Sequence, residues 1–463
     1  MIKEQHVRRS VVLCLTLLSS GLSGCSTIGL TDLFTDYATQ VTPVRQAIKA
    51  NNVNQAQQLL PNNGLSHSNY LLNQLENARL EDLNNQNTRA QTNYEAIYLQ
   101  MQKVRQAAKI KVSSSLEQSN ALLTNDSVIE YIPASYEMSM LHSYKALNYL
   151  YQNDLESALV EVRRANKVQL DALNENEQDI DSAIKEAQKH YPSMSEITQN
   201  VKNGFQNAYT FYLSALLYQS NNQFDDAYID YKKALEINPN NVYLQKDVMR
   251  LAKKQGFEQD FAAYVKRFGK LEQPKEAGEV IVFIEQGLVP KKDEFVLQLP
   301  IYTSRGDARF YSLAVPVYKG AAFTPTIRHL NIADESMPIE PLVRIEALAA
   351  KTLESQAPAR MTRQVLRLIA KEKVRAELAR SGGDVGNILA NIYNLASEQA
   401  DTRSWSTLPN QISIVRRNIS PGEHTLKIGS NQQSINFTVS KQGLTLIYLT
   451  SINNYFNSHV VQL

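Results

Sequence analysis

The sequence predicts a multidomain protein, in which an all-α solenoid is followed by a β-rich, sandwich-like domain with an inserted helical hairpin. From residue 31 to about 270, glycine is rare and apolar residues recur every three or four positions, as in packed helices. Alanines within this stretch recur at close to multiples of 34 residues. From Gly278 onward, the pattern changes to short segments rich in Val, Ile, Phe and Tyr and bounded by turn residues, which is typical of strands.

Residues 1–24 have the layout of a secretory signal peptide. A basic head precedes an apolar stretch, residues 11–22, and small residues follow at Ser23 and Gly24. A membrane-spanning helix needs about 20 apolar residues, and the serines and glycine at positions 19–21 interrupt this stretch too early. We therefore expect the segment to be removed.

The stretch Leu22-Ser23-Gly24-Cys25 resembles the lipobox of bacterial lipoproteins. The resemblance implies that Cys25 is acylated, with a fatty acid such as palmitate, and becomes the first residue of the mature chain. Ser26 after the cysteine resembles the sorting signal for the outer membrane of enteric-type bacteria. We expect a lipid-anchored protein on the periplasmic face of the outer membrane, with an ordinary signal peptide and a chance cysteine as the alternative.

Composition narrows the chemistry of the mature chain. Cys14 leaves with the signal peptide and Cys25 would be acylated, so no thiol remains for a disulfide, a zinc site or a nucleophile. Without residues 1–24 the chain has 45 basic and 45 acidic residues, and this balance does not suggest electrostatic capture of nucleic acid. We predict no cofactor, no metal and no nucleic-acid partner.

Seven residues in NAYTFYLSALLYQSNNQFDDAYIDYKKALEINPNN stand at successive gaps of four, three, nine, four, three and five: Phe211, Ala215, Tyr218, Ala227, Tyr231, Ala234 and Pro239. This spacing resembles a tetratricopeptide repeat. Small residues stand where two antiparallel helices touch, and the proline ends the second helix. The fold prediction is therefore a tetratricopeptide-like α-solenoid over residues 25–270.

The same spacing recurs upstream. Ala146, Tyr149, Ala158, Val162 and Ala165 follow it, with Leu170 in the proline position. Weaker echoes include Ala90 and Ala56, and the reference alanines at 56, 90, 158 and 227 lie 34, 68 and 69 residues apart. Residues 113–135 and 171–204 do not fit the register and are interpreted as interruptions.

Residues 278–463 form the predicted β-rich domain. Seven segments are expected to be strands: EVIVFIEQGLVP, DEFVLQLPIY, ARFYSLAVPVY, QISIVRRN, EHTLKIG, SINFTVS and LTLIYLTSI. Residues 341–400 return to helical spacing, with a break at Ser381-Gly382-Gly383-Asp384. The run from Ile419 onward resembles the small β-sandwich modules of bacterial surface proteins.

Residues suited to catalysis or metal binding are scarce. No two of the seven histidines have a metal-binding spacing, and His142 is expected to be a packed helix residue. The stretch from Ser381 to Gly386 lacks the ending of a phosphate-binding loop. Trp405, the single tryptophan, is expected to anchor the junction of the two domains, with an exposed ligand-stacking role as the alternative.

A tetratricopeptide array commonly binds a peptide or a helix on the inner face of its first helices. The repeat spacing places six residues on the candidate partner groove: Tyr209, Tyr212, Leu216, Gln219, Ser143 and Leu147. The Lys and Asn with which related clamps grip a C-terminal carboxylate are missing here. Packing of these side chains against neighbouring inserted helices is the alternative.

The whole-chain pattern, including YKALNYLYQNDLESALVEVRRAN, GEVIVFIEQGLVP and DTRSW, is similar to an uncharacterised family of tetratricopeptide-repeat lipoproteins of the Gram-negative envelope. We expect a non-enzymatic, lipid-anchored scaffold that binds protein or peptide partners through its repeats. Two alternatives stay open: an envelope enzyme, such as a cell-wall hydrolase with its site in the C-terminal domain, and a subunit of a secretion or surface-assembly complex.

Overall fold

The structure is a computed structural model that describes residues 36–111, 129–176, 203–272, 278–302, 308–319, 323–357, 360, 364, 399–429 and 433–463. The predicted signal peptide and Cys25 lie outside these ranges, as do most of the inserted helical hairpin and its Ser381-Asp384 break.

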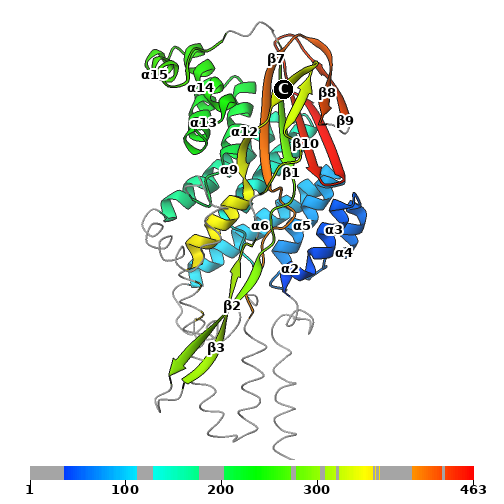
Figure 1. Ribbon diagram of the computed structural model, residues 1–463, viewed down its shortest axis with the longest axis vertical. Helices are drawn as coiled ribbons and strands as arrows, with labels where there is room; N and C mark the ends of the chain where they lie inside the picture. The colour runs from blue at the N-terminus through cyan, green and yellow to red at the C-terminus, as the bar shows by residue number, and fades with distance from the viewer. Residues whose placement is uncertain are drawn as a thin grey trace, which may run out of the picture.

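Helices occupy the first part of the chain, in antiparallel hairpins that stack side by side. The hairpins are α3–α4, α5–α6, α8–α9, α12–α13 and α14–α15, and the short helix α2 precedes them (Figure 1). The bounds are α2 Tyr37–Gln40, α3 Thr42–Lys49, α4 Val53–Leu59, α5 Tyr70–Leu83, α6 Asn87–Lys111, α8 Ser135–Tyr151, α9 Leu155–Asn176, α12 Ala208–Ser220, α13 Phe224–Ile237, α14 Val242–Lys254 and α15 Glu258–Phe268.

The same turn joins the helices of four hairpins. Asn51, Asn85, Asn153 and Asn222 occupy it, each with a φ between 57° and 62°, in the left-handed region that asparagine tolerates. The residue after each asparagine donates its backbone N–H to the carbonyl oxygen five positions earlier, at 2.8–2.9 Å. This bond closes the end of the first helix as in a Schellman motif.

The predicted register of the repeats is confirmed by burial. Ala56, Ala90, Ala158 and Ala227 each lie five residues after a turn asparagine, and all four are fully buried. In the last hairpin Gly256 takes the turn position with φ 72°, and Phe261 stands where the alanine would be. Helix α15 is the last of the array, packs on α14 and has no buried residue.

Within the described residues of the second part, the strands form three sheets. A five-stranded sheet has the order β11-β10-β1-β7-β6, a four-stranded sheet has the order β5-β4-β8-β9, and β2 and β3 form a separate hairpin. The bounds are β1 Gly278–Gln286, β2 Asp293–Tyr302, β3 Ala308–Val317, β4 His329–Ile332, β5 Glu335–Pro338, β6 Glu340–Arg344, β7 Gln411–Ile419, β8 Gly422–Ile428, β9 Gln433–Val439, β10 Leu444–Ile452 and β11 Tyr455–Gln462.

The five-stranded sheet is mixed, because β1 pairs with β10 in parallel and with β7 in antiparallel register. All seven predicted segments contain strands, whereas β4, β5, β6 and β11 were not predicted. The prediction that the inserted helices begin at Pro341 is wrong. Pro341 lies in β6, which pairs with β7, and the described helical residues that follow are 345–357, 360 and 364.

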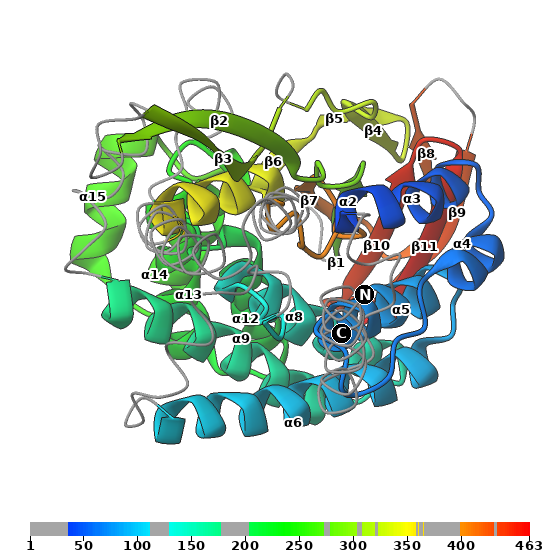
Figure 2. The ribbon, with the colours of Figure 1, turned by 90° about the horizontal axis from the view of Figure 1, so that it is seen from below.

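The helical hairpins form an arc around the five-stranded sheet (Figure 2). Side chains of α5, α8, α12 and α14 belong to the same buried apolar cluster as those of β1, β7 and β10. The helical part ends with α15 at Phe268, and the strand-rich part begins with β1 at Gly278. These two parts nevertheless share one hydrophobic core. Within the described ranges, none of the helices combines the length and the apolar character required to span a bilayer.

Candidate functional site: the concave face of the helical array

The predicted partner groove is not a free surface. Of the six residues assigned to it, five are buried: Tyr209, Tyr212, Leu216, Ser143 and Leu147. Gln219 is half-buried. The prediction that these side chains are open to a partner is therefore wrong, because the concave face packs on the chain's own sheet, with Ile345 and Leu348 of the inserted helical stretch in the same buried cluster.

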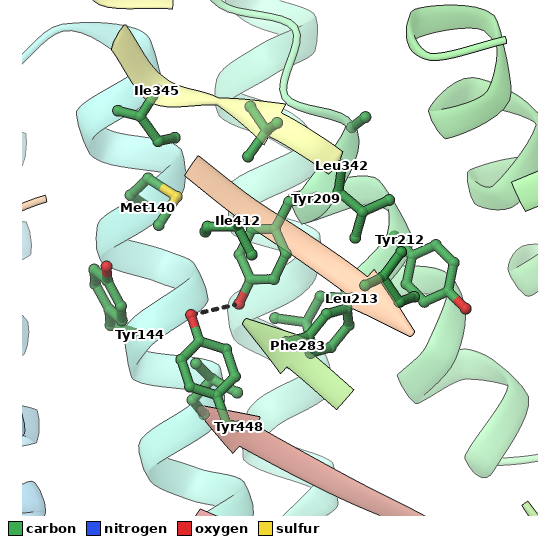
Figure 3. Close-up of a cluster of buried hydrophobic side chains, with 14 of the residues drawn as sticks. Met140, Tyr144, Tyr209, Tyr212, Leu213, Phe283, Leu342, Ile345, Ile412 and Tyr448 are labelled. Atoms are coloured by element: carbon green, nitrogen blue, oxygen red, sulfur yellow. Dashed lines mark hydrogen bonds between the residues drawn. The ribbon is translucent and has the colours of Figure 1, made fainter. Parts of the chain in front are cut away.

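Aromatic side chains of α12 meet the sheet edge-on (Figure 3). The rings of Tyr209 and Tyr212 lie 5.3 and 5.7 Å from the ring of Phe283 in β1, at interplanar angles of 88° and 89°. The Tyr209 hydroxyl also lies 3.5 Å from the hydroxyl of Tyr448 in β10. Edge-to-face contacts of this kind add to the burial of the rings, so α12 is fixed on the middle of the sheet.

Arg416 of β7 enters the groove between α12, α13 and α14. Its guanidinium forms a bidentate ion pair with Glu279, at 2.8 Å for both bonds, and lies 3.0 Å from Asp247. It also donates to the hydroxyls of Tyr212 at 3.1 Å and Tyr231 at 2.9 Å. These five residues, the Arg416 cluster, join the repeat to the sheet.

The Arg416 cluster is held by charge. Burial alone would raise the pKa of Glu279, but the Arg416 guanidinium holds that pKa below its usual value. Burial would likewise lower the pKa of Arg416, and the carboxylates of Asp247 and Glu279 raise it well above its usual value instead. A buried ion pair with satisfied hydrogen bonds is costly to break from one side, because the remaining charge then lacks a partner.

A second polar cluster joins the first hairpins to the sheet. Glu285 of β1, fully buried, accepts hydrogen bonds from Arg79 of α5, from the hydroxyls of Tyr144 and Tyr448 at 2.7 Å each, and from Thr450 at 2.9 Å. We call these residues the Glu285 cluster. Four donors around one buried carboxylate satisfy its hydrogen-bonding capacity and fix α5 and α8 to the sheet.

Asp82 lies beside the Glu285 cluster and has fewer hydrogen-bond donors than Glu285. Its oxygens accept from the Tyr94 hydroxyl and from the Asn148 amide, both at 2.8 Å. Burial raises the pKa of Asp82 to about 7, against the lowering effect of Arg79. The raised pKa favours protonation of Asp82 at pH values at which an exposed aspartate is ionised.

A cavity of about 20 Å³ opens between Asp82 and the sheet. A cavity needs about 10–15 Å³ to hold one water molecule, so this space suits water and is too small for a larger ligand. It is lined by Arg79, Asp82, Leu83, Asn87, Tyr144, Leu147, Asn148, Tyr151, Tyr448, Thr450, Asn457 and His459. Leu147, a predicted groove residue, thus lies on the wall of a water-sized space.

Residues 402–407, here called the Trp405 segment, bind the concave face through their backbone. The N–H of Trp405 donates to Glu137 of α8 at 2.8 Å. The N–H groups of Ser406 and Thr407 donate to Glu76 of α5, at 2.6 and 3.0 Å. Trp405 is fully buried, which confirms the predicted role of a junction anchor over an exposed one.

His142 takes part in a buried network between helices, as expected for a packed residue. Its Nδ1 lies 2.7 Å from Glu161 of α9, and Glu161 also binds Lys145 at 2.9 Å. Burial lowers the pKa of His142, and Glu161 offsets this effect only in part. The network crosses α8 and α9 and stabilises the hairpin.

The buried acids of the β-rich part are engaged by the chain itself. Besides Glu279 and Glu285, Glu346 accepts from Asn410 at 3.0 Å and Asp401 pairs with Arg403 at 2.8 Å. Over the described ranges, His, Cys, Asp and Glu side chains nowhere gather in threes in a way that could hold a metal ion. The arrangement performs intramolecular binding: Glu76 and Glu137 of the helices hold the backbone of the Trp405 segment, and Glu285 of the sheet holds Arg79 of α5.

Sequence reasoning missed Arg416, Glu285, Glu76 and Glu137. Glu285 carried a signal, since it interrupts the apolar run EVIVFIEQ of a buried strand. Arg416 carried a similar signal in QISIVRRN. Neither strand shows by itself that its partner lies on a distant helix: Tyr212 is 204 positions from Arg416, and Tyr144 is 141 positions from Glu285.

Residues 208–241 match the family model of the tetratricopeptide repeat. Among solved structures, the chain is similar to MamA, from residue 41 to its end, of Desulfovibrio magneticus RS-1, with 12% identity, 48% of this chain and 88% of that chain covered, and a TM-score of 0.27. It is also similar to the TPR2AB domain of yeast Sti1 in its pHSP90 complex, with 15% identity, 49% and 86% covered, and a TM-score of 0.19. No curated protein sequence matches the chain.

Proposed function

We propose that this protein is a non-enzymatic scaffold that is anchored by a lipid on Cys25 to the periplasmic face of the outer membrane and binds other proteins. The tetratricopeptide repeat at residues 208–241 supports the binding role. The lipobox resemblance of Leu22–Cys25 supports the anchor. The observation that carries the proposal is the closed concave face: the array holds its own sheet and so forms a fixed framework.

Because the concave face is filled, partners are expected on the outer faces. The second helices of two hairpins carry exposed apolar side chains, Val160 and Leu170 on α9 and Ile229 on α13. Ile229 is 50% exposed and stands in the same helix as exposed Asp225, Asp226 and Glu236. Apolar side chains among charges are what the centre and rim of a protein interface need.

Affinity purification from membranes tests the binding role. We expect the acylated chain to recover a partner that a Val160→Glu/Ile229→Glu variant loses, because each glutamate places a charge where the interface excludes water. Ser434→Glu, at an exposed position of β9, is the matched control and should keep the partner. Recovery of the same proteins by both variants would contradict the proposed surface.

Labelling cells with radioactive palmitate tests the anchor separately. The natural chain should be labelled and a Cys25→Ser variant should not, and an unlabelled natural chain would overturn the anchor. The enzyme alternative is tested by incubating the purified chain with peptidoglycan, where release of soluble fragments would sink the scaffold proposal. Crosslinking that recovers a stable multi-protein machine would favour the assembly-complex alternative.

A further inference from the structure

We infer that the end of the molecule where the chain enters its fold rests on the lipid bilayer, as a second membrane contact beside the lipid on Cys25. This inference rests on the proposed anchoring. Five exposed apolar side chains, called the apolar end, mark this region: Leu65, Ile129 and Ile132, and Phe295 and Val296 on the two faces of the hairpin β2–β3.

The members of the apolar end come from three segments that hydrogen bonds bring together. The N–H of Tyr131 donates to the carbonyl of Ser68 at 2.9 Å, which joins the loop carrying Leu65 to the stretch carrying Ile129 and Ile132. The carbonyl of Ile129 accepts from the Arg403 guanidinium at 2.7 Å. Arg403 belongs to the Trp405 segment.

The hairpin β2–β3 and the start of the fold reach the same segment. Lys292, three residues before Phe295, donates its ammonium to the carbonyl of Arg403 at 2.6 Å. The N–H of Ala38 in α2 donates to the hydroxyl of Thr402 at 3.3 Å. The apolar end and the first described residue, Asp36, therefore surround one short stretch of chain.

The five side chains are exposed by 69, 46, 53, 43 and 47% for Leu65, Ile129, Ile132, Phe295 and Val296. In Figure 1, α2 and the β2–β3 hairpin lie in the lower part of the view, whereas α15, β8 and β9 lie at the opposite end. Exposed apolar groups gathered at one end of a protein mark a surface that another apolar phase covers.

The length of chain before Asp36 identifies the bilayer as that phase. Ten residues, 26–35, separate Cys25 from Asp36, and even fully extended they span at most about 38 Å. A lipid on Cys25 thus keeps this end of the fold close to the headgroups. No comparable tether limits the distance of α15 from the membrane.

Charged residues of both signs lie at the apolar end. We therefore expect insertion of apolar side chains, and not charge attraction, to drive binding to the bilayer. Glu130 is exposed between Ile129 and Ile132, and Lys319 is exposed at the end of the β2–β3 hairpin. With both signs present, attraction to anionic lipid is not the main contribution. Binding should scale with buried apolar area and depend little on salt.

Fluorescence quenching on the acylated full chain tests the inference. The acylated cysteine has no free thiol, so Ile132→Cys introduces a unique site for a bimane label. In vesicles of phosphatidylethanolamine and phosphatidylglycerol with brominated acyl chains, we expect quenching at position 132. Ile229→Cys, on the outer face of the array, is the matched control and should stay unquenched; vesicle-bound protein without quenching at 132 would overturn the inference.

A second measurement does not need the anchor. The unacylated Cys25→Ser chain should sediment with zwitterionic vesicles. Adding Ile129→Ser and Ile132→Ser should lower its affinity for the vesicles at least about tenfold. Equal sedimentation would refute the bilayer contact whether or not palmitate labels Cys25. A dimer in analytical ultracentrifugation that the two serines dissociate would assign the apolar end to a second copy and also overturn it.

Discussion

At the scale of single residues, buried charges decide how the helices and the sheet stay together. Glu285 accepts hydrogen bonds from four side chains, one of them the Arg79 guanidinium, whereas Asp82 has two neutral donors and a pKa raised by burial to about 7. Its pKa in the unfolded chain is the ordinary 3.8. The folded protein therefore binds a proton at Asp82 that the unfolded chain releases between these two values.

Asp82→Asn should change how stability depends on pH. The contribution of Asp82 is fully present below about pH 4 and is lost as the pH rises through about 7, because the folded state binds the proton more tightly. Relative to the variant, the natural chain should lose on the order of 2–4 kcal/mol of unfolding free energy between pH 4 and pH 8. Urea denaturation followed by circular dichroism across this range measures the difference.

Asp171→Asn is the matched control for that titration. Asp171 is partly exposed and pairs with Lys167 at 2.8 Å within α9. Exposed pairs of this kind contribute little, so its pH profile should parallel that of the natural chain. A profile for Asp82→Asn that parallels the natural chain as well would show that Asp82 is not the proton-binding group.

At the scale of elements, the hairpins repeat because their turns repeat. The asparagine in the left-handed conformation and the alanine five residues later recur in four hairpins. The first allows the chain to reverse, and the second allows the two helices to approach. Together they define a repeat even where the family model matches only residues 208–241.

Asn222→Ala should destabilise the protein by about 1–2 kcal/mol, because a β-carbon without a polar group is strained at a φ of 57°. Asn222→Gly should be tolerated, since glycine adopts this conformation without strain. Asn221→Ala is the control, because Asn221 has an ordinary φ of −91°. The midpoints of urea unfolding measure these effects. Equal decreases in the midpoint for Asn222→Ala and Asn221→Ala would disprove the strain argument.

The helices and seven strands were predictable because local patterns specify them. Ala158 and Ala227 mark helix contacts, and the alternation in LTLIYLTSI marks a strand. The turn asparagines also recurred in the sequence, at 51, 85, 153 and 222, but asparagine is common in this chain and its φ is not visible in the pattern. Strand β6 was hidden, since Pro341 begins a stretch whose spacing also suits a helix.

The site was not predictable to the same degree. The spacing placed Tyr212 and Leu216 on the inner face, and they do face inward. What covers that face depends on a contact between Tyr212 and Arg416, which are 204 positions apart. No periodicity encodes such a pairing, so the spacing alone leaves both a foreign partner and internal packing open, and it does not identify the chain's own sheet as the occupant.

At the scale of the whole molecule, the helical arc and the sheet should unfold together. The Arg416 cluster, the Glu285 cluster and the Trp405 segment each join the two parts through buried polar groups. Removal of either part would leave acids such as Glu76 and Asp247 buried without partners, or exposed with their apolar neighbours. Neither part is therefore expected to fold as an independent domain.

Arg416→Ala should lower the unfolding free energy by about 3–5 kcal/mol, because it leaves Asp247 and Glu279 buried without their cation. Helical circular dichroism and Trp405 fluorescence should still report one coincident transition at a lower urea concentration. Arg417→Ala, which loses a bond to the Ile332 carbonyl and a pair with exposed Glu335, should cost clearly less. Separate transitions in the natural chain would refute the shared core.

The filled arc also bears on mechanics. An open superhelix of hairpins is elastic, because its curvature changes when its ends are pulled. In this protein the five-stranded sheet fills the inside of the arc, so the curvature of the hairpins is fixed. The bond from Ala38 to Thr402 connects the entry of the chain, within its first folded turn, to the Trp405 segment, which leads into β7 of that sheet. Tension on the N-terminal tether is therefore delivered to the centre of the molecule without first stretching the hairpins, and the protein should respond to load as a stiff strut.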